Sequence, residues 1–524
     1  MSFSFVHRVA TTPRASSTHR ITVPSRPVPS RPVVTLRLVP ITSAHSHHVA
    51  RRGCATSRAR HRQSRRTGER VRRRRFERGA SLINARARSR ALEPTAPRKV
   101  VTRITSLRAR ARARSHLAST PPTDERARFS RRAQRFQKSP DDVVIVSACR
   151  TPITRAKRGG LARTPADDLL ATVLQASVER GKIDVRDVGD IVVGSVLGAS
   201  SQRANECRIA MFLAGFPKEV PVRTTNRQCS SGLQACADVA AGIKAGYYDM
   251  GIGAGVETMT ANPMKWEGGF NPRIASSSDA QNCLIPMGVT SENVAEKFGI
   301  SREAQDTMAA RSHARAANAR ATGRFTQEIV PVRTKNAEGV DVVVSEDDGI
   351  REGTTVATLA KLPAVFKKGG STTPGNASQV SDGAAAVVLA RRSYAEKHGL
   401  PILATWRSFA AVGCDPAIMG VGPAVAIPEA LRAVNLNVND VDLYELNEAF
   451  ASQATYSIEK LGLDPERVNV NGGAIALGHP LGATGARCLA TLIHEMHRRG
   501  GKVGICSMCI GSGMGAAATL TRDD

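Results

Sequence analysis

Four short segments of this chain each place one chemically capable side chain among small residues. They are N-R-Q-C-S-S-G-L-Q-A (226–235) with Cys229, N-E-A-F-A (447–451) with Asn447, G-H-P-L-G-A-T-G (478–485) with His479, and C-I-G-S-G-M-G (509–515) with Cys509. A cysteine nucleophile needs a base, hydrogen-bond donors for an oxyanion, and close approach of the backbone to the substrate. The four segments can supply all three, which predicts covalent chemistry on Cys229.

Cys229 is expected at the start of a helix, where partial positive charge favours a thiolate. The small residues that follow, Ser230 to Gly232, leave room for a substrate carbonyl, and their amides are candidate donors. A free thiol is more often a buried structural residue. The flanking sequence and the partner segments favour the chemical interpretation here.

Cys509 ends a predicted strand, and the glycines after it permit tight turns close to a ligand. With Cys506 it forms a C-x-x-C pair, a pattern that also occurs in redox and zinc sites. Residues three apart on a strand point to opposite faces, and no second cysteine pair completes a zinc site. Cys506 is therefore expected to point away from the site.

His479 and Asn447 are the candidate partners of Cys229. Pro480 suits a first helical turn, so His479 is expected at a helix start, where the positive helix end favours a neutral imidazole. Asn447 and Glu448 follow the carboxyl end of a predicted strand, where α/β sheets bind ligands. Asn447 can hold a water for an oxyanion, and Glu448 is expected to orient other groups. The histidines expected on helix surfaces or ends, without a chemical role, are His313, His398, His494 and His497.

The charge of the chain is concentrated in an arginine-rich leader. Residues 1–140 carry 35 Lys and Arg against 5 Asp and Glu, which accounts for the whole formal net charge of +30. The neutral remainder gives no reason to expect nucleic acid or an anionic membrane as a partner. The ten cysteines have no clustered spacing, which favours a reducing compartment over a disulfide framework. No apolar run reaches the ~18 residues of a membrane span.

The leader is expected to be disordered, because a segment so rich in arginine cannot pack a core. Its arginine runs at 72–75 and 108–114 can hold RNA weakly through phosphates. No aromatic ladder or basic fold accompanies them, so specific nucleic-acid binding is not expected. The first 50 residues contain six arginines and no acidic residue, a composition that resembles an organelle transit sequence.

One segment of the leader resembles a peroxisomal import signal of the pattern R-[L/V/I]-x5-H-L. R-I-T-S-L-R (103–108) is separated from S-H-L (115–117) by the run A-R-A-R-A-R, and removal of this run would restore the pattern. We therefore predict a peroxisomal location with an import receptor as partner. A mitochondrial or plastid location is the alternative that the leader's composition leaves open.

The body of the chain repeats itself. D-I-V-V-G-S-V (190–196) corresponds to D-V-D-L-Y-E-L-N (440–447), and each of Cys229 and His479 precedes a Gly/Ala-rich helix and a small-residue strand. Two copies of an α/β unit, each with mostly parallel strands, are predicted. A helix at 301–320, capped by Ser301, lies in an insertion. The proposed divisions are a leader (1–140), a first half (141–267), a loop domain over the site (268–374), a return to the first half (375–400) and a second half (401–524).

The four segments together resemble the thiolase family, and within it the peroxisomal 3-ketoacyl-CoA thiolases of plants and algae. The likeness covers essentially all of 141–524, and R-T-P-I (150–153), P-M-G-V-T-S-E-N-V-A (286–295) and G-N-A-S-Q-V-S-D-G-A (375–384) add to it. It implies a five-layered αβαβα fold of two similar halves with a loop domain. It also implies a homodimer.

The resemblance assigns a role to each candidate residue. Cys229 is the implied nucleophile, His479 its activator, Asn447 the holder of an oxyanion-hole water, and Cys509 the acid and base at the acetyl α-carbon. The amides of Cys229 and Gly511 match a second oxyanion hole. The positions that match the pantetheine or acyl channel are Ser378, Met287 and Phe450.

The implied reaction is cleavage of a 3-ketoacyl-CoA by CoA through an acyl-cysteine, with CoA as a substrate and no metal or prosthetic group. Pro286 stands where many acetoacetyl-CoA thiolases have histidine, which favours the degradative branch, although an acetoacetyl-CoA thiolase stays the nearest alternative. A ketoacyl synthase would have a histidine in place of Cys509. A non-enzymatic lipid carrier or RNA-binding protein would have lost a chemical residue, and none is lost.

Overall fold

The computed structural model describes residues 136–198, 202–266 and 268–523. Three predictions concern residues 1–135, which lie outside the described residues. They are the disorder of the leader, weak RNA contacts at its arginine runs, and an import signal. Every described cysteine is free. Within these ranges no helix combines the length and the apolar character needed to cross a bilayer.

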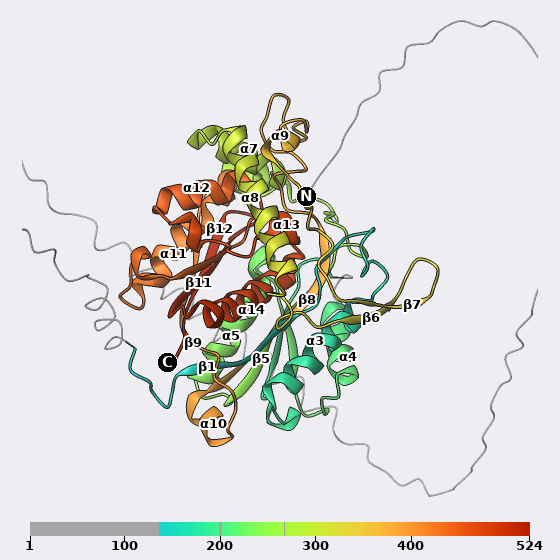
Figure 1. Ribbon diagram of the computed structural model, residues 1–524, viewed down its shortest axis with the longest axis vertical. Helices are drawn as coiled ribbons and strands as arrows, with labels where there is room; N and C mark the ends of the chain where they lie inside the picture. Colours follow the sequence, from blue (N-terminus) through green and yellow to red (C-terminus); the bar gives the residue numbers. More distant parts are fainter. Residues whose placement is uncertain (1–135, 199–201, 267, 524) are drawn as a thin grey trace, which may run out of the picture. The chain divides into compact units, whose positions relative to one another are not determined.

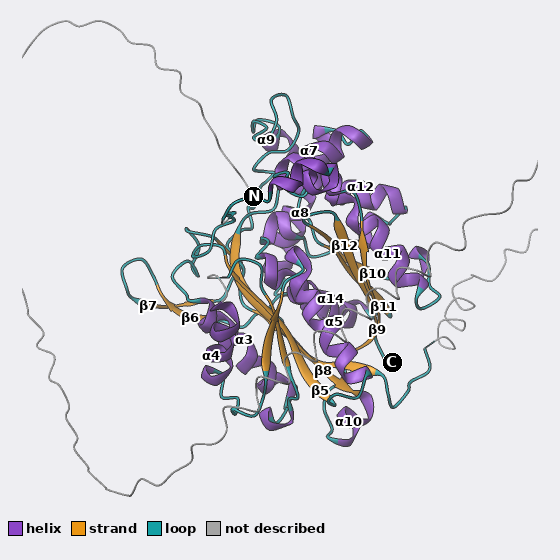
Figure 2. Cartoon of the chain, turned by 180° about the vertical axis from the view of Figure 1, so that it is seen from behind, coloured by secondary structure: helices purple, strands orange, loops and turns teal. Residues whose placement is uncertain are grey.

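Two similar sets of strands, one from each half of the chain, join into one mixed sheet (Figures 1 and 2). They meet where β1 runs antiparallel to β9. The first set lies in the order β4 (Val222–Thr225), β3 (Ile191–Gly194), β5 (Met250–Thr258), β8 (Ser381–Arg391) and β1 (Val143–Arg150), with β2 (Thr154–Arg155) on β8. The second set lies in the order β10 (Leu443–Leu446), β11 (Val503–Ile510), β12 (Met514–Thr521) and β9 (Ala404–Gly413).

The internal repeat predicted from the sequence is confirmed. β3 and β10 take equivalent places, and so do β5 with β11, β8 with β12 and β1 with β9. Even the short strand β4 has a counterpart, because Val468 bridges to Tyr444 of β10 in parallel. Each half therefore supplies the same framework.

Most strands of each half run in one direction, as expected, and β8 and β12 are the exceptions. β3 is parallel to β4 and β5, and β10 to β11, but β8 and β12 run antiparallel to both of their long neighbours. A parallel pair needs a crossover connection of a dozen or more residues. The turn at 511–513 joins β11 to β12 in three residues, so these strands can only be antiparallel.

The helices form three layers around the two sets of strands, which gives the five-layered αβαβα arrangement expected from the resemblance. Helices α5 (Ser231–Lys244) and α14 (Leu481–Arg499) lie between the two sets and share one core with both (Figure 2). The first-half strands are covered on their outer face by α3 (Ala166–Gly181) and α4 (Arg203–Leu213). The second-half strands are covered by α11 (Gly422–Arg432) and α12 (Ala451–Leu461).

Glycines allow the two central helices to touch through their backbones. A Cβ on Gly232 of α5 would lie 2.7 Å from the carbonyl oxygen of Gly482 in α14. A Cβ on Gly485 would clash with the backbone nitrogen of Leu233. The helices that follow Cys229 and His479 therefore begin side by side.

The inserted region carries its own elements, which lie outside the ten-stranded sheet. They are α6 (Ser278–Asn282), α7 (Met287–Phe298), α8 (Arg302–Ala321), the hairpin β6 (Val332–Lys335) and β7 (Asp341–Val344), and α9 (Val356–Leu359). The Ser301 hydroxyl accepts a hydrogen bond from the amide of Ala304, which confirms the predicted cap of α8. The short helices α10 (Arg392–Lys397) and α13 (Ala474–Leu477) complete the described α-helices. The chain divisions drawn from the sequence stay predictions.

The expectation that His313 lies on a helix surface is wrong. His313 of α8 is buried, and its Nδ1 accepts a hydrogen bond from the amide of Arg351 at 3.2 Å. Burial and the charge of Arg351 lower the pKa of His313 to about 4. The weak amphipathic pattern of α8, with polar side chains on its buried face, hid this burial from sequence analysis.

Replacing Gly485 with alanine should destabilise the protein by separating α5 from α14. We expect the free energy of unfolding to fall by about 1–3 kcal/mol, the usual cost of forcing an extra carbon into a packed core. Urea unfolding of the full chain measures it. Gly413→Ala is the matched control, because a Cβ at Gly413 meets open space. Equal stability of the two variants would contradict the backbone contact.

Candidate active site

An apolar cavity of about 190 Å³ brings together residues from both halves and from the insertion. Cys229 and His479 both face it, and three of its other walls are the candidates Met287, Ser378 and Phe450. The remaining lining is formed by Met259, Met264, Gly288, Phe366, Ala377, Gln379, Val380, Met419, Ala449 and Leu481. Segments up to about 250 residues apart in the sequence thus build one pocket, as the repeat predicts.

Cys229 lies where a strand gives way to a helix, as expected. β4 ends at Thr225, a short 3-10 turn covers Gln228–Ser230, and α5 begins at Ser231. The side chain is buried, and burial raises the pKa of its thiol above the ordinary value. Hydrogen bonds from the backbone amides of Gly511 and of Cys229 itself act in the opposite direction but do not overcome burial.

The prediction of a thiolate favoured by the helix start is therefore corrected. In the free protein the Cys229 sulfur is a neutral thiol, because the cost of burying a charge exceeds the benefit of the nearby amides. A base must remove its proton when the substrate is in place.

His479 is held from three sides. Its backbone N–H donates to the carbonyl oxygen of Gln379 at 3.1 Å. Its Nδ1 lies 2.7 Å from Oγ1 of Thr484, and its Nε2 lies 3.4 Å from Nδ2 of Asn447. The Thr484 hydroxyl donates its one proton to the carbonyl oxygen of Pro480 at 3.2 Å, so it accepts from Nδ1. This assignment leaves the Nε2 lone pair unprotonated.

Electrostatics keep the imidazole neutral. Burial and the charge of Arg487 lower the pKa of His479 to about 3. The predicted neutral form is therefore confirmed, but its main cause is burial and not the helix end. The geometry and the pKa together leave Nε2 of His479 unprotonated at neutral pH, so it can accept a proton.

Asn447 sits directly after β10 and its side chain is buried. Its backbone N–H donates to the carbonyl oxygen of Ser507 in β11 at 2.9 Å, while its Oδ1 makes no hydrogen bond to a described residue. The adjacent Glu448 accepts hydrogen bonds from Ser312 of α8 and from Asn469, at 2.6 and 2.8 Å. Glu448 thus ties the insertion to the second half, the orienting role expected of it.

Cys509 ends β11 and is fully buried beside Met419 and Ala449. Burial raises the pKa of its thiol well above the ordinary value, and the neighbouring Cys229 and Cys414 act in the same direction. Cys509 is therefore a thiol, and it lies close enough to Cys229 for ionisation of one sulfur to oppose ionisation of the other. Cys506 points to the other face of the strand, away from the site, as predicted. There it packs against α14.

The loop that carries Ser378 is paired with the loop that carries Phe450. The amide of Ser378 donates to the carbonyl oxygen of Ala449 at 3.0 Å, and Ala377 bridges to Phe450. Met287 begins α7 of the insertion. The pocket thus brings all three predicted lining residues together.

Sequence reasoning missed two supporting residues. Thr484 lies in the quoted G-H-P-L-G-A-T-G segment, and its spacing from His479 near a helix start was the available signal. Glu257 gave no signal. Its buried carboxylate accepts hydrogen bonds from the amides of Val196, Leu197 and Gly482 at 2.9–3.0 Å, which fastens the start of α14 to the first half.

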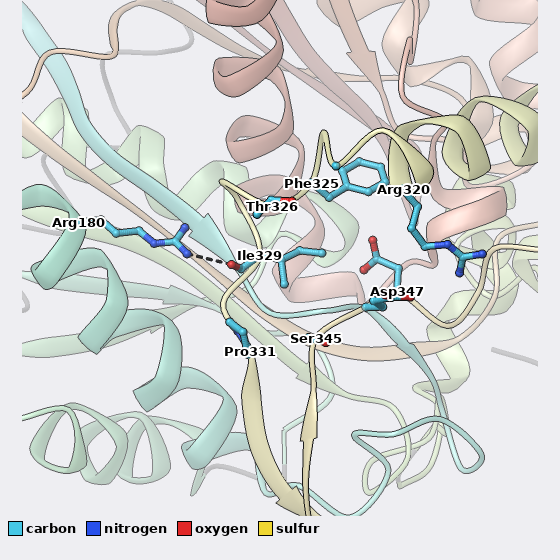
Figure 3. A pocket seen from close by; sticks show the side chains of 10 residues that line it. Arg180, Arg320, Phe325, Thr326, Ile329, Pro331, Ser345 and Asp347 are labelled. Carbon is cyan, nitrogen blue, oxygen red and sulfur yellow. Dashed lines mark hydrogen bonds between the residues drawn. The ribbon is translucent and has the colours of Figure 1, made fainter.

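A second cavity of about 370 Å³ lies elsewhere, below α8 and beside the β6–β7 hairpin (Figure 3). Three of the four charged residues that line it are already paired, and one of these pairs joins Arg320 to Glu352. Arg180 donates to the backbone oxygen of Ile329 at 2.9 Å, as Figure 3 draws, and Asp347 pairs with buried Arg150 at 2.7 Å. None of the predicted site residues lines it, so we assign it no chemistry.

Comparison with known proteins gives a consistent result along the body of the chain. Residues 143–393 match the family described as thiolase, N-terminal domain, and residues 400–522 match thiolase, C-terminal domain. The chain is 62% identical over 398 residues to peroxisomal 3-ketoacyl-CoA thiolase 2 of Arabidopsis thaliana, covering 75% of this chain and 86% of that protein.

Two solved structures extend the comparison. The dimeric peroxisomal thiolase of Saccharomyces cerevisiae is similar with a TM-score of 0.70 and 44% identity, over 75% of this chain and 100% of that one. The human mitochondrial 3-ketoacyl-CoA thiolase in complex with CoA is similar with a TM-score of 0.67 and 37% identity, over 74% and 99% of the two chains.

The lowered pKa of His479 should make stability depend on pH. Between about pH 3 and 6.5 the folded protein binds fewer protons at this residue than the unfolded chain, so the free energy of unfolding falls as the pH falls. In His479→Gln the change with pH between 4.5 and 6.5 should be smaller by up to about 1.4 kcal/mol per pH unit. Urea unfolding measures it, with His398→Gln as control. Identical slopes for wild type and His479→Gln would contradict the lowered pKa.

Proposed function

The chain belongs to the thiolase family, and on this premise we propose which of its residues perform each step of the reaction. It is a 3-ketoacyl-CoA thiolase, an acyltransferase of fatty acid β-oxidation. The net reaction cleaves a 3-ketoacyl-CoA with CoA, and gives acetyl-CoA and an acyl-CoA that is shorter by two carbons. CoA is therefore a substrate of the enzyme.

In the first half of the reaction, Nε2 of His479 takes the proton of the Cys229 thiol, and the sulfur attacks the 3-keto carbon. The C2–C3 bond then breaks, the acyl group stays on Cys229 as a thioester, and the acetyl-CoA enolate takes a proton from Cys509. The protonation states support this order. His479 is neutral and Cys509 is a thiol before the substrate arrives.

In the second stage of the reaction, the thiol of free CoA attacks the acyl group on Cys229. Its proton passes to the Cys509 thiolate that the first stage left behind, and the shortened acyl-CoA leaves. His479, which took the first proton, then returns it to Cys229 as the sulfur departs. Each proton is thereby accounted for by a residue at the cavity or directly behind its wall.

Two groups of donors support the negative oxygens. Asn447 and His479 lie 3.4 Å apart, and the unpartnered Oδ1 of Asn447 can accept from a water, which supports a first oxyanion hole at the enolate oxygen. The amides of Cys229 and Gly511 both reach the Cys229 sulfur, which supports a second hole at the acyl carbon. Oxyanion donors fixed in advance lower such barriers because they need no reorganisation.

We propose that the reaction needs no metal or prosthetic group, because these residues can carry out every proton transfer named above. The observation that carries the assignment is the meeting of Cys229 and His479, contributed by two equivalent halves, at one apolar cavity. Cys509 is buried directly behind it, against the lining residues Met419 and Ala449.

We propose a homodimer formed along the free edge of the first-half strands. β4 is the last strand of the sheet, and the adjacent α4 exposes Ile209, Phe212 and Leu213 to 50, 45 and 58%. A two-fold arrangement would cover both the strand edge and these apolar side chains.

The enzyme is peroxisomal, like the relatives that it matches. We propose that an import receptor binds the leader, through the segment at 103–117 that lies outside the described residues. That segment does not fit the import pattern as it stands.

Replacing Cys229 with alanine should abolish thiolysis while the protein still binds CoA. We expect the rate to fall by about 10⁴-fold or more, as for loss of a nucleophile in other covalent enzymes. Steady-state assays with 3-ketoacyl-CoA substrates of several chain lengths, with calorimetry for CoA, measure it. Cys207→Ala, in α4 and outside the cavity, is the control. Turnover near wild type in Cys229→Ala would rule out the nucleophile. A wild-type enzyme that cleaves only acetoacetyl-CoA would rule out the broad substrate range.

Replacing Cys509 with serine should separate its two proposed steps. Exchange of the acetyl-CoA α-protons with deuterated water should slow by about 10²–10⁴-fold, the usual contribution of a general acid or base. Acylation of Cys229, followed by mass spectrometry, should change much less. Equal losses in both measurements would contradict the assignment of Cys509 to the α-carbon proton.

A further inference from the structure

A pair of side chains links the loop of Cys229 to the turn after Cys509. Nε2 of Gln228 donates to Oγ of Ser512 at 2.9 Å, across 284 residues of sequence. The Ser512 hydroxyl in turn donates to the carbonyl oxygen of Gly511 at 2.6 Å. The chain of bonds therefore runs from the nucleophile's neighbour to the residue whose amide reaches the Cys229 sulfur.

Both residues adopt a backbone conformation that side chains rarely take. The φ angles of Gln228 and Ser512 are +46° and +59°. Such angles cost free energy and persist only where surrounding contacts hold them. At Gln228 the holding contacts are the bond from its amide to Oδ1 of Asn226, at 2.9 Å, and the bond from the Ser231 hydroxyl to its carbonyl, at 2.6 Å.

Gly511 is enclosed by this pair. A Cβ at Gly511 would collide with Oε1 of Gln228 and would lie 3.6 Å from Sδ of Met287. The Gln228 side chain therefore packs against the Gly511 backbone with one of its amide atoms while it bonds to Ser512 with the other. Nothing in the proton transfers named above uses Gln228 or Ser512.

We propose that Gln228 and Ser512 are positioning residues that hold the Gly511 amide against the Cys229 sulfur, and so set the rate of acyl transfer to and from Cys229. This inference rests on the proposed function, since it assigns Gly511 to the second oxyanion hole. It does not involve the α-carbon chemistry of Cys509. Loss of the pair should therefore slow acyl transfer to and from Cys229 and leave proton exchange at the acetyl α-carbon unchanged.

The test uses two substitutions at one position of the full-length enzyme. Ser512→Gly removes the hydroxyl and also removes the backbone strain, so it should fold at least as well as wild type. Ser512→Thr keeps the hydroxyl. We expect Ser512→Gly to slow acylation of Cys229 by about tenfold, less than the 10²–10³-fold loss that follows removal of an oxyanion donor. The α-proton exchange of acetyl-CoA should stay within about twofold, and Ser512→Thr should stay near wild type in both.

A second measurement does not depend on the enzyme's activity. The Gly511 amide favours the Cys229 thiolate, so its displacement in Ser512→Gly should raise the pH midpoint of Cys229 alkylation by iodoacetamide by roughly 0.5 unit. Gln228→Leu keeps the bulk against Gly511 but removes the donor, and should act like Ser512→Gly. The double variant should be no slower than the slower single variant, because both break one interaction.

The outcomes are distinct. Acylation within twofold of wild type in Ser512→Gly, equal slowing of acylation and α-proton exchange, or an unchanged alkylation midpoint would each overturn the positioning role. If the wild-type enzyme forms no acyl-cysteine, the proposed function fails instead, and the alkylation midpoints still decide whether the pair holds the Gly511 amide at the sulfur.

Discussion

The contact between the backbones of α5 and α14 is the constraint on which the site depends. Gly232 and Gly482, at equivalent places in the two halves, leave no room for a side chain between the helices. Because Cys229 and His479 lie just before these helices, the contact that aligns the helices also brings the proposed nucleophile and its proposed base to one cavity. A wider spacing, as side chains would impose, would separate the two groups by more than a proton transfer can tolerate.

Burial decides the protonation states of the titratable groups at the site. A helix start favours charge on a sulfur, and the sequence alone points to a thiolate at Cys229. Burial is the stronger effect, and it raises the pKa values of Cys229 and Cys509 and lowers that of His479. All three groups therefore rest in neutral forms. In the proposed mechanism charge develops only during the reaction, when the amides and Asn447 are already in place to receive it.

The duplicated framework could be predicted because its two copies share local sequence patterns. The small-residue helices after Cys229 and His479, and the matching strand segments at 190–196 and 440–447, recur within the sequence itself. The reversed direction of β8 and β12 could not be read in the same way. It depends on connection lengths and on which strands meet, and β8 reaches its partners only after the whole insertion has intervened.

The chemical residues were predictable for a related reason, and their supports were not. Cys229, Asn447, His479 and Cys509 stand in segments of small residues, a composition that permits close approach to a ligand. Glu257 and the Gln228–Ser512 pair act through contacts between residues distant in the chain, and such contacts leave no local trace. The burial of His313 was missed because its helix carries polar residues on the face that packs inward.

The walls of the cavity suit an enzyme whose own product can return as a shorter substrate. Four methionines, at 259, 264, 287 and 419, line the space beside Phe450 and Leu481. Methionine is unbranched and flexible, so it can fill or vacate space with little strain, whereas branched side chains would fix one shape. Two of the four come from the framework of the first half or its extension, one from the insertion and one from the second half. Each part of the fold thus contributes an adaptable wall, and we infer that acyl chains of decreasing length can be held against the same sulfur without moving the rigid helices that place it.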